Sequence, residues 1–326
     1  MTARILVCGG AGYIGAHMVR RLQLDGHDVV VLDNLSTGHR AAVQGAGLVE
    51  ADLLDAPELA RVFDAHRFDC VMHFSARSLV GESMARPYEY YRANVTGTLN
   101  LLEAMQRAGV QRFIFSSTAA VFGTPRAPVI DETHPTAPIN PYGATKLMVE
   151  RVLADAATAH GLRSVSLRYF NAAGASPQGG IGESHVPETH LVPLAIAAAL
   201  DTGRRLQVFG TDYDTPDGTC IRDYVHVDDL ADAHVRAMDL TAREPGAHAF
   251  NLGNGAGFSV REVIASVGRV SGREVPFEEA PRRAGDPPVL VASSTRARDV
   301  LGWTPQYRDL DAIVRTAWDW HRAPAY

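Results

Sequence analysis

Residues 8–15 read CGGAGYIG and follow directly on an apolar run. Gly9, Gly12 and Gly15 have the spacing GxxGxxG, and Gly10 with the last two also fits GxGxxG. Glycines between a strand and a helix permit a tight turn, and they let the backbone and the helix N-terminus approach a pyrophosphate. The stretch predicts the first strand, turn and helix of a dinucleotide-binding fold, although a glycine-rich turn alone often does nothing but turn.

The second apolar run ends in VLDNLS and places Asp33 23 residues after Gly10. An acidic residue about 20 residues beyond such a loop typically binds the nucleotide ribose. A carboxylate accepts hydrogen bonds from both ribose hydroxyls and repels a 2′-phosphate, so the spacing favours NAD over NADP. A solvated Asp at a strand end is the alternative, and the nearby Arg40 leaves NADP open.

Strand-sized apolar runs alternate with helical stretches through the first half of the chain. The expected strands lie at 4–10, 27–33, 47–53, 69–75, 111–117 and 163–170, and helices are expected at 13–26, 93–109 and, near the end, 310–323. This alternation predicts an α/β protein with a Rossmann-type, doubly wound parallel sheet and helices on both faces.

From about Ser176 the alternation breaks, first in the Gly/Pro-rich segment 176–190 and then in the polar segment 210–224, which we expect to be a long loop. We therefore expect an NAD-binding Rossmann domain over residues 1–175. Segments around 220–255 are expected to return to it. Residues 176–326 are expected to form a smaller C-terminal α/β lobe that binds the substrate.

Composition excludes several classes of partner. The 326 residues carry a net charge of −6 and no basic block, so a nucleic acid is not expected. The apolar runs are shorter than the ~20 residues of a membrane span. The three cysteines Cys8, Cys70 and Cys220 fit neither a disulfide framework nor a metal site, which suits a reducing cytoplasm. The 13 histidines show no HExxH-like pattern, so no metal site is expected.

Residues 141–146 read PYGATK, and Lys146 is the only lysine in a chain with 30 arginines. Pro141 favours a helix start, so Tyr142 and Lys146, at i and i+4, should project from one helix face. A cation beside the phenol, together with oxidised nicotinamide, would lower the tyrosine pKa toward that of a useful base. A solvent-facing Tyr–Lys pair is the alternative. The stretch FSSTAAVFG adds hydroxyls at a strand end, of which Thr118 is the third, although such residues often only satisfy local backbone groups.

With these motifs, the segments LDNLSTG, HFSARSLVGES, LRYFNAAGA, DGTCIRDYVHVDDLADAH and APRRAGD occur in order along nearly the whole chain. Together they resemble the extended short-chain dehydrogenase/reductase family, and within it the 4-epimerases of UDP-sugars. The resemblance implies NAD as a retained cofactor and 4-epimerisation of UDP-hexoses (UDP-galactose and UDP-glucose). The reaction would proceed by transient oxidation at C4, rotation of the 4-keto sugar and re-reduction.

The resemblance also implies residue roles. Tyr142 would be the catalytic acid/base, Lys146 would bind the nicotinamide ribose and lower the pKa of the tyrosine, and Thr118 would hydrogen-bond the sugar 4-oxygen. The cofactor contacts would be Gly9, Gly12, Tyr13, Ile14, Gly15, Asp33, Asn34, Leu35, Ser36, Thr37, Gly38, Asp52, Leu53, Phe74, Ser75, Ala76, Ser78, Asn94, Tyr142, Lys146 and Phe170. The UDP-sugar contacts would be Thr118, Tyr142, Asn171, His190, Leu191, Gln207, Val208, Phe209, Arg222, Tyr224, Arg283 and Asp286.

Other activities of the family remain alternatives. Dehydratases carry an acidic residue just after the catalytic threonine, where this chain has Ala119 and Ala120, so dehydration is disfavoured. A regulator that only binds NAD would typically lack the Tyr or the Lys. An epimerase for UDP-GlcNAc/UDP-GalNAc or UDP-pentoses stays open, since Leu290 stands where some members have a bulky tyrosine that narrows the sugar pocket.

Two further positions depart from the family pattern. Ser78 replaces a lysine that touches the cofactor phosphates in some members, and PETH at 187–190 replaces a Pro-Asn-Asn pattern. The resemblance finally implies a homodimer joined through a four-helix bundle that includes the Tyr–Lys helix.

Overall fold

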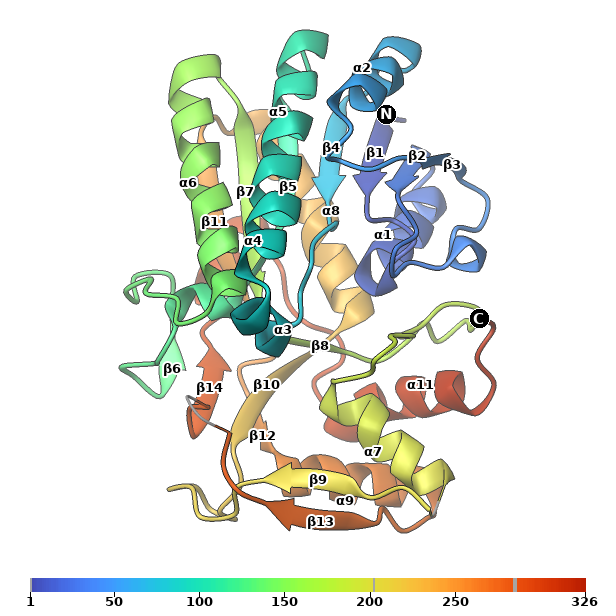
Figure 1. Cartoon of the computed structure of the whole chain (residues 1–326), viewed down its shortest axis with the longest axis vertical. Coiled ribbons are helices and arrows are strands. Elements are labelled where there is room, and N and C mark those ends of the chain that lie inside the picture. The colour runs from blue at the N-terminus through green and yellow to red at the C-terminus, as the bar shows by residue number, and fades with distance from the viewer. Residues whose placement is uncertain (1, 202, 284–285) are drawn as a thin grey trace.

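A seven-stranded parallel sheet forms the larger part of the molecule (Figure 1). The computed structural model describes residues 2–201, 203–283 and 286–326. The strand order is β11-β7-β5-β4-β1-β2-β3. The strands are β1 (Arg4–Cys8), β2 (Asp28–Asp33), β3 (Gly47–Glu50), β4 (Cys70–His73), β5 (Arg112–Thr118), β7 (Arg163–Tyr169) and β11 (Ala247–Leu252). The order reverses between β1 and β4, and ligands of such sheets bind beyond the carboxyl ends of the strands at that point.

Helices cover both faces of this sheet, because successive apolar residues of its strands point to opposite faces and each face needs a covering layer. Ile5 and Val7 of β1 face the core under α1 and α8, whereas Leu6 and Cys8 face the core under α2, α5 and α6. These helices are α1 (Tyr13–Leu24), α2 (Ala56–Ala65), α5 (Gly97–Ala108), α6 (Pro141–His160) and α8 (Val227–Arg243). The doubly wound fold predicted from the sequence is confirmed.

A smaller unit lies below the carboxyl ends of the large sheet in Figure 1. Its sheets order as β12-β10-β14-β6, with β8 paired to β10, and as β13-β9. The strands are β6 (Val129–Ile130), β8 (Asn171–Ala173), β9 (Leu206–Phe209), β10 (Ile221–His226), β12 (Gly257–Ser259), β13 (Phe277–Ala280) and β14 (Val289–Ala292). Its helices α7 (Leu191–Leu200), α9 (Val260–Ser271) and α11 (Leu310–Arg322) share one apolar core.

Short elements complete the described chain. They are 3₁₀ turns at Arg40–Ala42 and Ala119–Phe122, α3 (Val80–Ala85), α4 (Pro87–Tyr90), a π-helical turn at Tyr91–Thr96 and α10 (Thr295–Leu301). Several expected strands end two or three residues early, and two expected elements differ in type. The expected helix 93–109 begins as the π-helical turn, and the expected loop 210–224 ends in strand β10.

The missed strand β10 is explained by a buried carboxylate. Asp223 is fully buried because its oxygens accept hydrogen bonds from the backbone N–H groups of Asn254, Gly255 and Ala292. A charged residue within the segment had indicated a solvent-exposed loop. From the segment around 220–255, α8 packs on the large sheet and β11 extends it, whereas β10 lies in the smaller sheet.

Candidate active site

The glycine loop packs tightly on one side and is accessible on the other. Gly9 has φ 79°, and a Cβ there would lie 2.5 Å from the amide nitrogen of Ser75, just beyond β4. A Cβ on Gly15 would lie 2.1 Å from the carbonyl oxygen of Gly9. A Cβ on Gly12 would meet only that same oxygen, at 3.5 Å. The first and third glycines are therefore required by packing, whereas Gly12 leaves the backbone free for a ligand to approach.

Asp33 ends β2 beside this loop. One carboxylate oxygen accepts the N–H of Ala11 at 3.0 Å, and the other accepts the N–H of Leu35 at 2.9 Å. Leu35 adopts φ 54°, and a Cβ on Gly38 would crowd the backbone of Ala11 at 2.9 Å, so segment 33–38 folds closely over the loop. Burial raises the pKa of Asp33, and the two backbone donors partly offset that shift.

Asn94 joins the loop after β4 to helix α6. Its side-chain oxygen accepts the N–H of Arg77 at 2.9 Å, and its amide nitrogen donates to the Arg77 carbonyl and to the Thr145 hydroxyl, both at 3.0 Å. Asn94 lies in the π-helical turn, a distortion that is frequent at functional sites. The loop that holds Phe74, Ser75, Ala76 and Ser78 is thereby fixed next to the Tyr–Lys helix.

Helix α6 presents Tyr142 and Lys146 as the sequence predicted. Asn140 caps the helix by accepting the N–H of Gly143 at 2.8 Å, and Pro141 occupies the first turn. The Lys146 ammonium donates to the carbonyl of Ser116 on β5 at 2.8 Å. It lies 5.9 Å from the centre of the Tyr142 ring. The solvent-facing alternative is wrong, since Lys146 is only 2% exposed.

The charge state of this pair is set by burial. Desolvation lowers the pKa of Lys146 to about 7, and the nearby Glu150 carboxylate acts in the opposite direction. Desolvation raises the pKa of Tyr142, and hydrogen bonding to the Thr118 side chain partly offsets that rise. The chain's own groups thus favour a protonated tyrosine. This direction is opposite to the lowered pKa expected from the sequence, an expectation that included a positive nicotinamide ring beside Tyr142.

Sequence reasoning missed Glu150, which lies four residues after Lys146 on the same helix. Its carboxylate accepts hydrogen bonds from Ser117 at 2.6 Å and from Arg168 at 2.9 Å, and both ionic side chains are about 10% exposed or less. The i, i+4 spacing from the only lysine was the available signal. Thr118 ends β5, and its hydroxyl accepts the N–H of Ala120 at 3.1 Å.

The predicted UDP-sugar contacts come from several elements of the smaller unit. Asn171 begins β8, while Arg222 and Tyr224 lie on β10. Arg222 pairs with Asp286, and the guanidinium of Arg283 stacks 4.0 Å above the ring of Phe209. The structure therefore brings both arginines beside predicted partners, where their donors suit a diphosphate.

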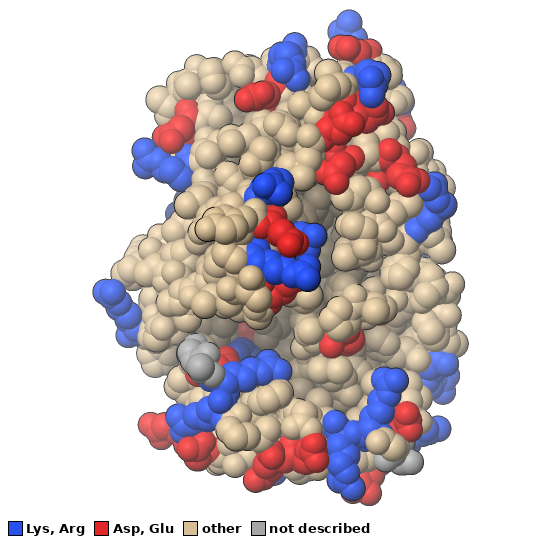
Figure 2. All heavy atoms as spheres, viewed as in Figure 1, with Lys and Arg blue, Asp and Glu red and all other residues tan. Residues whose placement is uncertain are grey.

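Three other predicted contacts have different surroundings. Val208 is fully buried in an apolar cluster, so only its backbone can face a ligand. The side chain of Gln207 hydrogen-bonds Glu278 on the neighbouring strand β13. His190 precedes α7, next to Leu191, and its imidazole pairs with Glu183. In Figure 2 the surface is hollowed between the large sheet and the smaller unit, with basic and acidic side chains at the rim.

Comparison with known proteins decides the family. Residues 5–253 match the NAD dependent epimerase/dehydratase family. The chain belongs to this family. A member from Azospirillum brasilense, a UDP-glucose 4-epimerase, is 53% identical over 321 residues, which cover 98% of this chain and 92% of that protein. The UDP-glucose 4-epimerase of Brucella ovis, solved in complex with NAD, is 50% identical, with a TM-score of 0.95 over 98% of both chains.

A third similar protein is the UDP-Glc/GlcNAc 4-epimerase of Campylobacter jejuni. It is 44% identical, with a TM-score of 0.86 over 98% of this chain and 99% of that one. NAD is the cofactor of the family, and the site fits it. Gly12 leaves space at the start of α1, and Asp33 retains acceptor capacity at the end of β2. Among the described residues, no helix is long and apolar enough to cross a membrane.

Proposed function

We propose that this protein interconverts UDP-galactose and UDP-glucose by NAD-dependent 4-epimerisation. The observation that carries the proposal is the placement of Tyr142, Lys146 and Thr118 together at the carboxyl end of β5, which only β4 separates from β1 and its glycine loop. The identity to UDP-glucose 4-epimerases over nearly the whole chain supports the same reaction. Bound NAD supplies a nicotinamide ring that exchanges hydride with the sugar C4.

The chain's own residues handle the proton. Tyr142 removes the proton of the sugar 4-hydroxyl through its phenolic oxygen and returns it after the 4-keto sugar has rotated. Thr118 hydrogen-bonds the sugar 4-oxygen and positions it. Lys146 binds the nicotinamide ribose, and its buried ammonium favours the phenolate electrostatically. Glu150, which holds a proton on Lys146, is a positioning residue for this chemistry.

The smaller unit holds the nucleotide part of the substrate. Arg222 and Arg283 bind the diphosphate through their guanidinium donors, and Asp286 and Phe209 orient these two groups. We assign residues 1–175 except strands β6 and β8, together with α8 and β11, to the cofactor-binding domain, and β6, β8 and the rest of 176–326 to the UDP-sugar lobe. The remaining cofactor and sugar contacts given by the resemblance stay predictions.

The dehydratase alternative lacks its acid. Ala119 and Ala120 form a 3₁₀ turn directly after Thr118, and neither can donate a proton to a leaving hydroxyl. Activity on N-acetylated UDP-sugars is a second candidate, favoured by one observation. Leu290 lies on β14 opposite Arg222 and packs against the apolar cluster that contains Ala119 and Phe170, so a side chain smaller than tyrosine lies beside these predicted site residues.

We also propose a cytoplasmic homodimer. Helices α5 and α6 border an apolar groove lined by Leu99, Leu102, Val152 and Ala156, and Leu99 is 39% exposed. Pairing of these helices across a two-fold axis would bury this groove in a four-helix bundle. Sedimentation at equilibrium should give twice the chain mass. The mass of a single chain, at concentrations where the enzyme is active, would contradict the proposal.

The experiment that tests the activity uses purified protein, NAD and a panel of UDP-sugars. UDP-galactose should give UDP-glucose and reach the same equilibrium mixture from either side. UDP-GlcNAc and UDP-xylose in the same panel identify the preferred sugar. No turnover of any UDP-hexose by folded protein that contains NAD would refute the function. Accumulation of a 4-keto-6-deoxy product would instead support the dehydratase alternative.

A further inference from the structure

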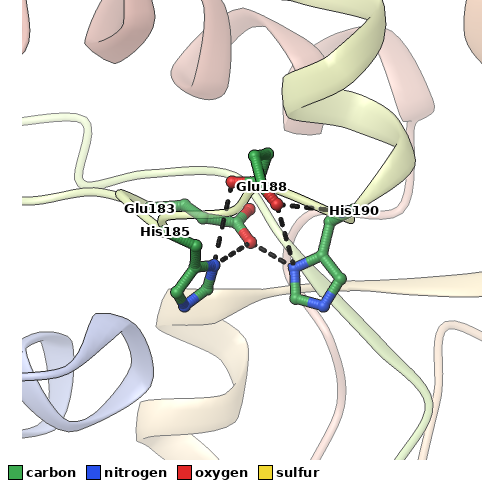
Figure 3. A group of neighbouring side chains, drawn as sticks. All are labelled: Glu183, His185, Glu188 and His190. Carbon is green, nitrogen blue, oxygen red and sulfur yellow. Dashed lines mark hydrogen bonds and ion pairs between the residues drawn. The ribbon is translucent and has the colours of Figure 1, made fainter. Parts of the chain in front are cut away.

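Four side chains converge in the loop between β8 and α7, within the segment ESHVPETH (Figure 3). They are Glu183, His185, Glu188 and His190, and one nitrogen or oxygen from each lies within 4.8 Å of the others. Both imidazoles present Nδ1 to the same Glu183 oxygen: His185 lies 3.2 Å from it and His190 is hydrogen-bonded to it. The Glu188 oxygens lie 3.7 and 4.0 Å from the two Nδ1 atoms.

This donor set is chemically that of a transition-metal site. Imidazole nitrogen with carboxylate oxygen suits zinc, whose bonds to these atoms are about 2.0–2.2 Å in tetrahedral sites. A tetrahedron of that size separates its ligand atoms by about 3.4 Å, so only small side-chain movements are required. Two carboxylates neutralise a divalent cation, which removes the cost of a net charge in this largely buried place.

The surrounding contacts hold the ligands in place. One Glu188 oxygen accepts the N–H groups of Thr189 at 2.7 Å and His190 at 2.8 Å, which orients the carboxylate. The indole N–H of Trp320 on α11 donates to the backbone carbonyl of Glu183 at 2.8 Å. Glu183 itself is 3% exposed. Outer contacts of this kind normally accompany metal ligands.

Metal entry is possible from one side. The side chain of His190 is 53% exposed, whereas that of Glu183 is 3% exposed. The cluster is therefore buried on the Glu183 side and open to solvent on the His190 side. No metal site was predicted from the sequence because the histidines show no HExxH-like pattern, whereas the structure brings these four side chains together. A cis peptide bond precedes Pro187 within this segment.

We propose that Glu183, His185, Glu188 and His190 bind one divalent zinc ion, which holds the 183–190 loop in one conformation. This loop adjoins three functional regions: the ring of His185 lies 6.2 Å from that of Tyr13 in the glycine-loop helix, the Ser184 carbonyl contacts His39, and His190 directly precedes α7. The ion would stabilise the junction between the cofactor-binding sheet and the UDP-sugar lobe. It lies outside the Tyr–Lys site and takes no part in proton transfer.

The competing reading is an ion-pair cluster of two imidazolium and two carboxylate groups without metal. Untagged full-length protein with bound NAD should be stripped with a chelator and titrated with Zn²⁺ and with Co²⁺. We expect one equivalent of zinc per chain, a raised melting temperature, and visible absorption bands typical of tetrahedral Co²⁺. X-ray absorption should show nitrogen and oxygen neighbours at about 2.0–2.2 Å and no sulfur.

Variants make the assignment specific. Glu183→Gln and the double variant H185Q/H190Q should bind zinc more than about tenfold more weakly, since even outer-sphere partners are worth about 10–100-fold. His248→Ala, at a partly exposed histidine on β11, should bind zinc as the wild type does. No stoichiometric zinc in the wild type, a sulfur shell, or unchanged affinity in folded E183Q would overturn the proposal. The Co²⁺ spectrum of the wild type decides the matter even where a variant fails to fold.

Discussion

Replacing Lys146 by methionine should remove most of the activity and leave the fold at least as stable. Methionine has a similar length and no charge, and Lys146 is 2% exposed. Lys146 acts through Tyr142, whose proton transfer is typically worth about 10²–10⁴-fold in rate, so loss of the ammonium should cost up to that factor. Replacement of buried ionic groups by apolar ones often stabilises by about 1–4 kcal/mol where no charge is left unpaired, and Glu150 keeps Arg168 as its partner in this variant. The lost hydrogen bond to the Ser116 carbonyl costs about 1 kcal/mol, so the net gain is about 0–3 kcal/mol.

The sign of the pH dependence follows from the lowered pKa of Lys146. Burial lowers this pKa from 10.5 to about 7, so between these values the unfolded chain binds the proton more tightly than the folded chain does. The free energy of unfolding of the wild type therefore rises with pH across that window. The methionine side chain of the Lys146→Met variant takes up no proton. The stability advantage of the variant should be largest at pH 7 and below, and should shrink toward pH 10.5.

The assay combines turnover of UDP-galactose with urea unfolding at several pH values. Lys146→Arg is the matched variant, since it keeps the charge but must fit a planar guanidinium where a compact ammonium reaches Ser116. It should nearly abolish turnover, keep the fold and lose about 1–3 kcal/mol through overpacking. Turnover of either variant within tenfold of the wild type would refute the role of the ammonium. A methionine variant whose stability advantage is independent of pH would refute the buried charge.

Gly12→Ala should lose bound NAD, and its NAD-free form should melt near the temperature of the NAD-free wild type. Gly15→Ala, whose Cβ would lie 2.1 Å from a carbonyl oxygen, should also melt lower in that form; NAD absorbance and thermal melts of the NAD-free proteins distinguish the two. Glu150→Gln should lower the pKa of the active-site lysine further and move the alkaline limb of the pH–rate profile to lower pH. It should also cost up to about 3–5 kcal/mol, because a buried arginine loses its charged partner. Leu290→Tyr should reduce kcat/KM for UDP-GlcNAc by about 10–200-fold and leave that for UDP-galactose nearly unchanged, as paired kinetics would show.

The sequence sufficed for the large sheet because its strands are apolar on both faces and glycines mark the functional turn. Residues such as Ile5 to Cys8 read as a continuous apolar run, as expected for a parallel strand between two helical layers. Strand β10 could not be read in the same way. Asp223 lies inside it, and the backbone donors that allow its burial come from residues 254, 255 and 292, far along the chain.

In the candidate site, too, local relations could be predicted from the sequence, whereas relations between distant residues could not. Tyr142 and Lys146 share one helix, so their relation follows from spacing. The charge of Lys146 depends on burial and on Glu150 of the same helix. The Glu150 carboxylate is held in turn by Arg168 on strand β7. Likewise, His185 and His190 could be read as ligands only after the loop had brought Glu183 beneath them. Electrostatics depends on distances that the sequence does not contain.

The single lysine also offers one labelling site inside the fold, because only the α-amine at the N-terminus would compete for an amine-reactive reagent. The residue is 2% exposed, and burial lowers the pKa of its ε-amine to about 7, so this amine loses its proton more readily than that of an exposed lysine. Bulky amine-reactive reagents should modify it only when the chain opens, which turns the labelling rate into a measure of native-state unfolding. Small reagents shaped like a sugar nucleotide could instead reach it through the site. Because Lys146 is the only lysine, acylation of a lysine ε-amine could occur in this chain only at the proposed active site.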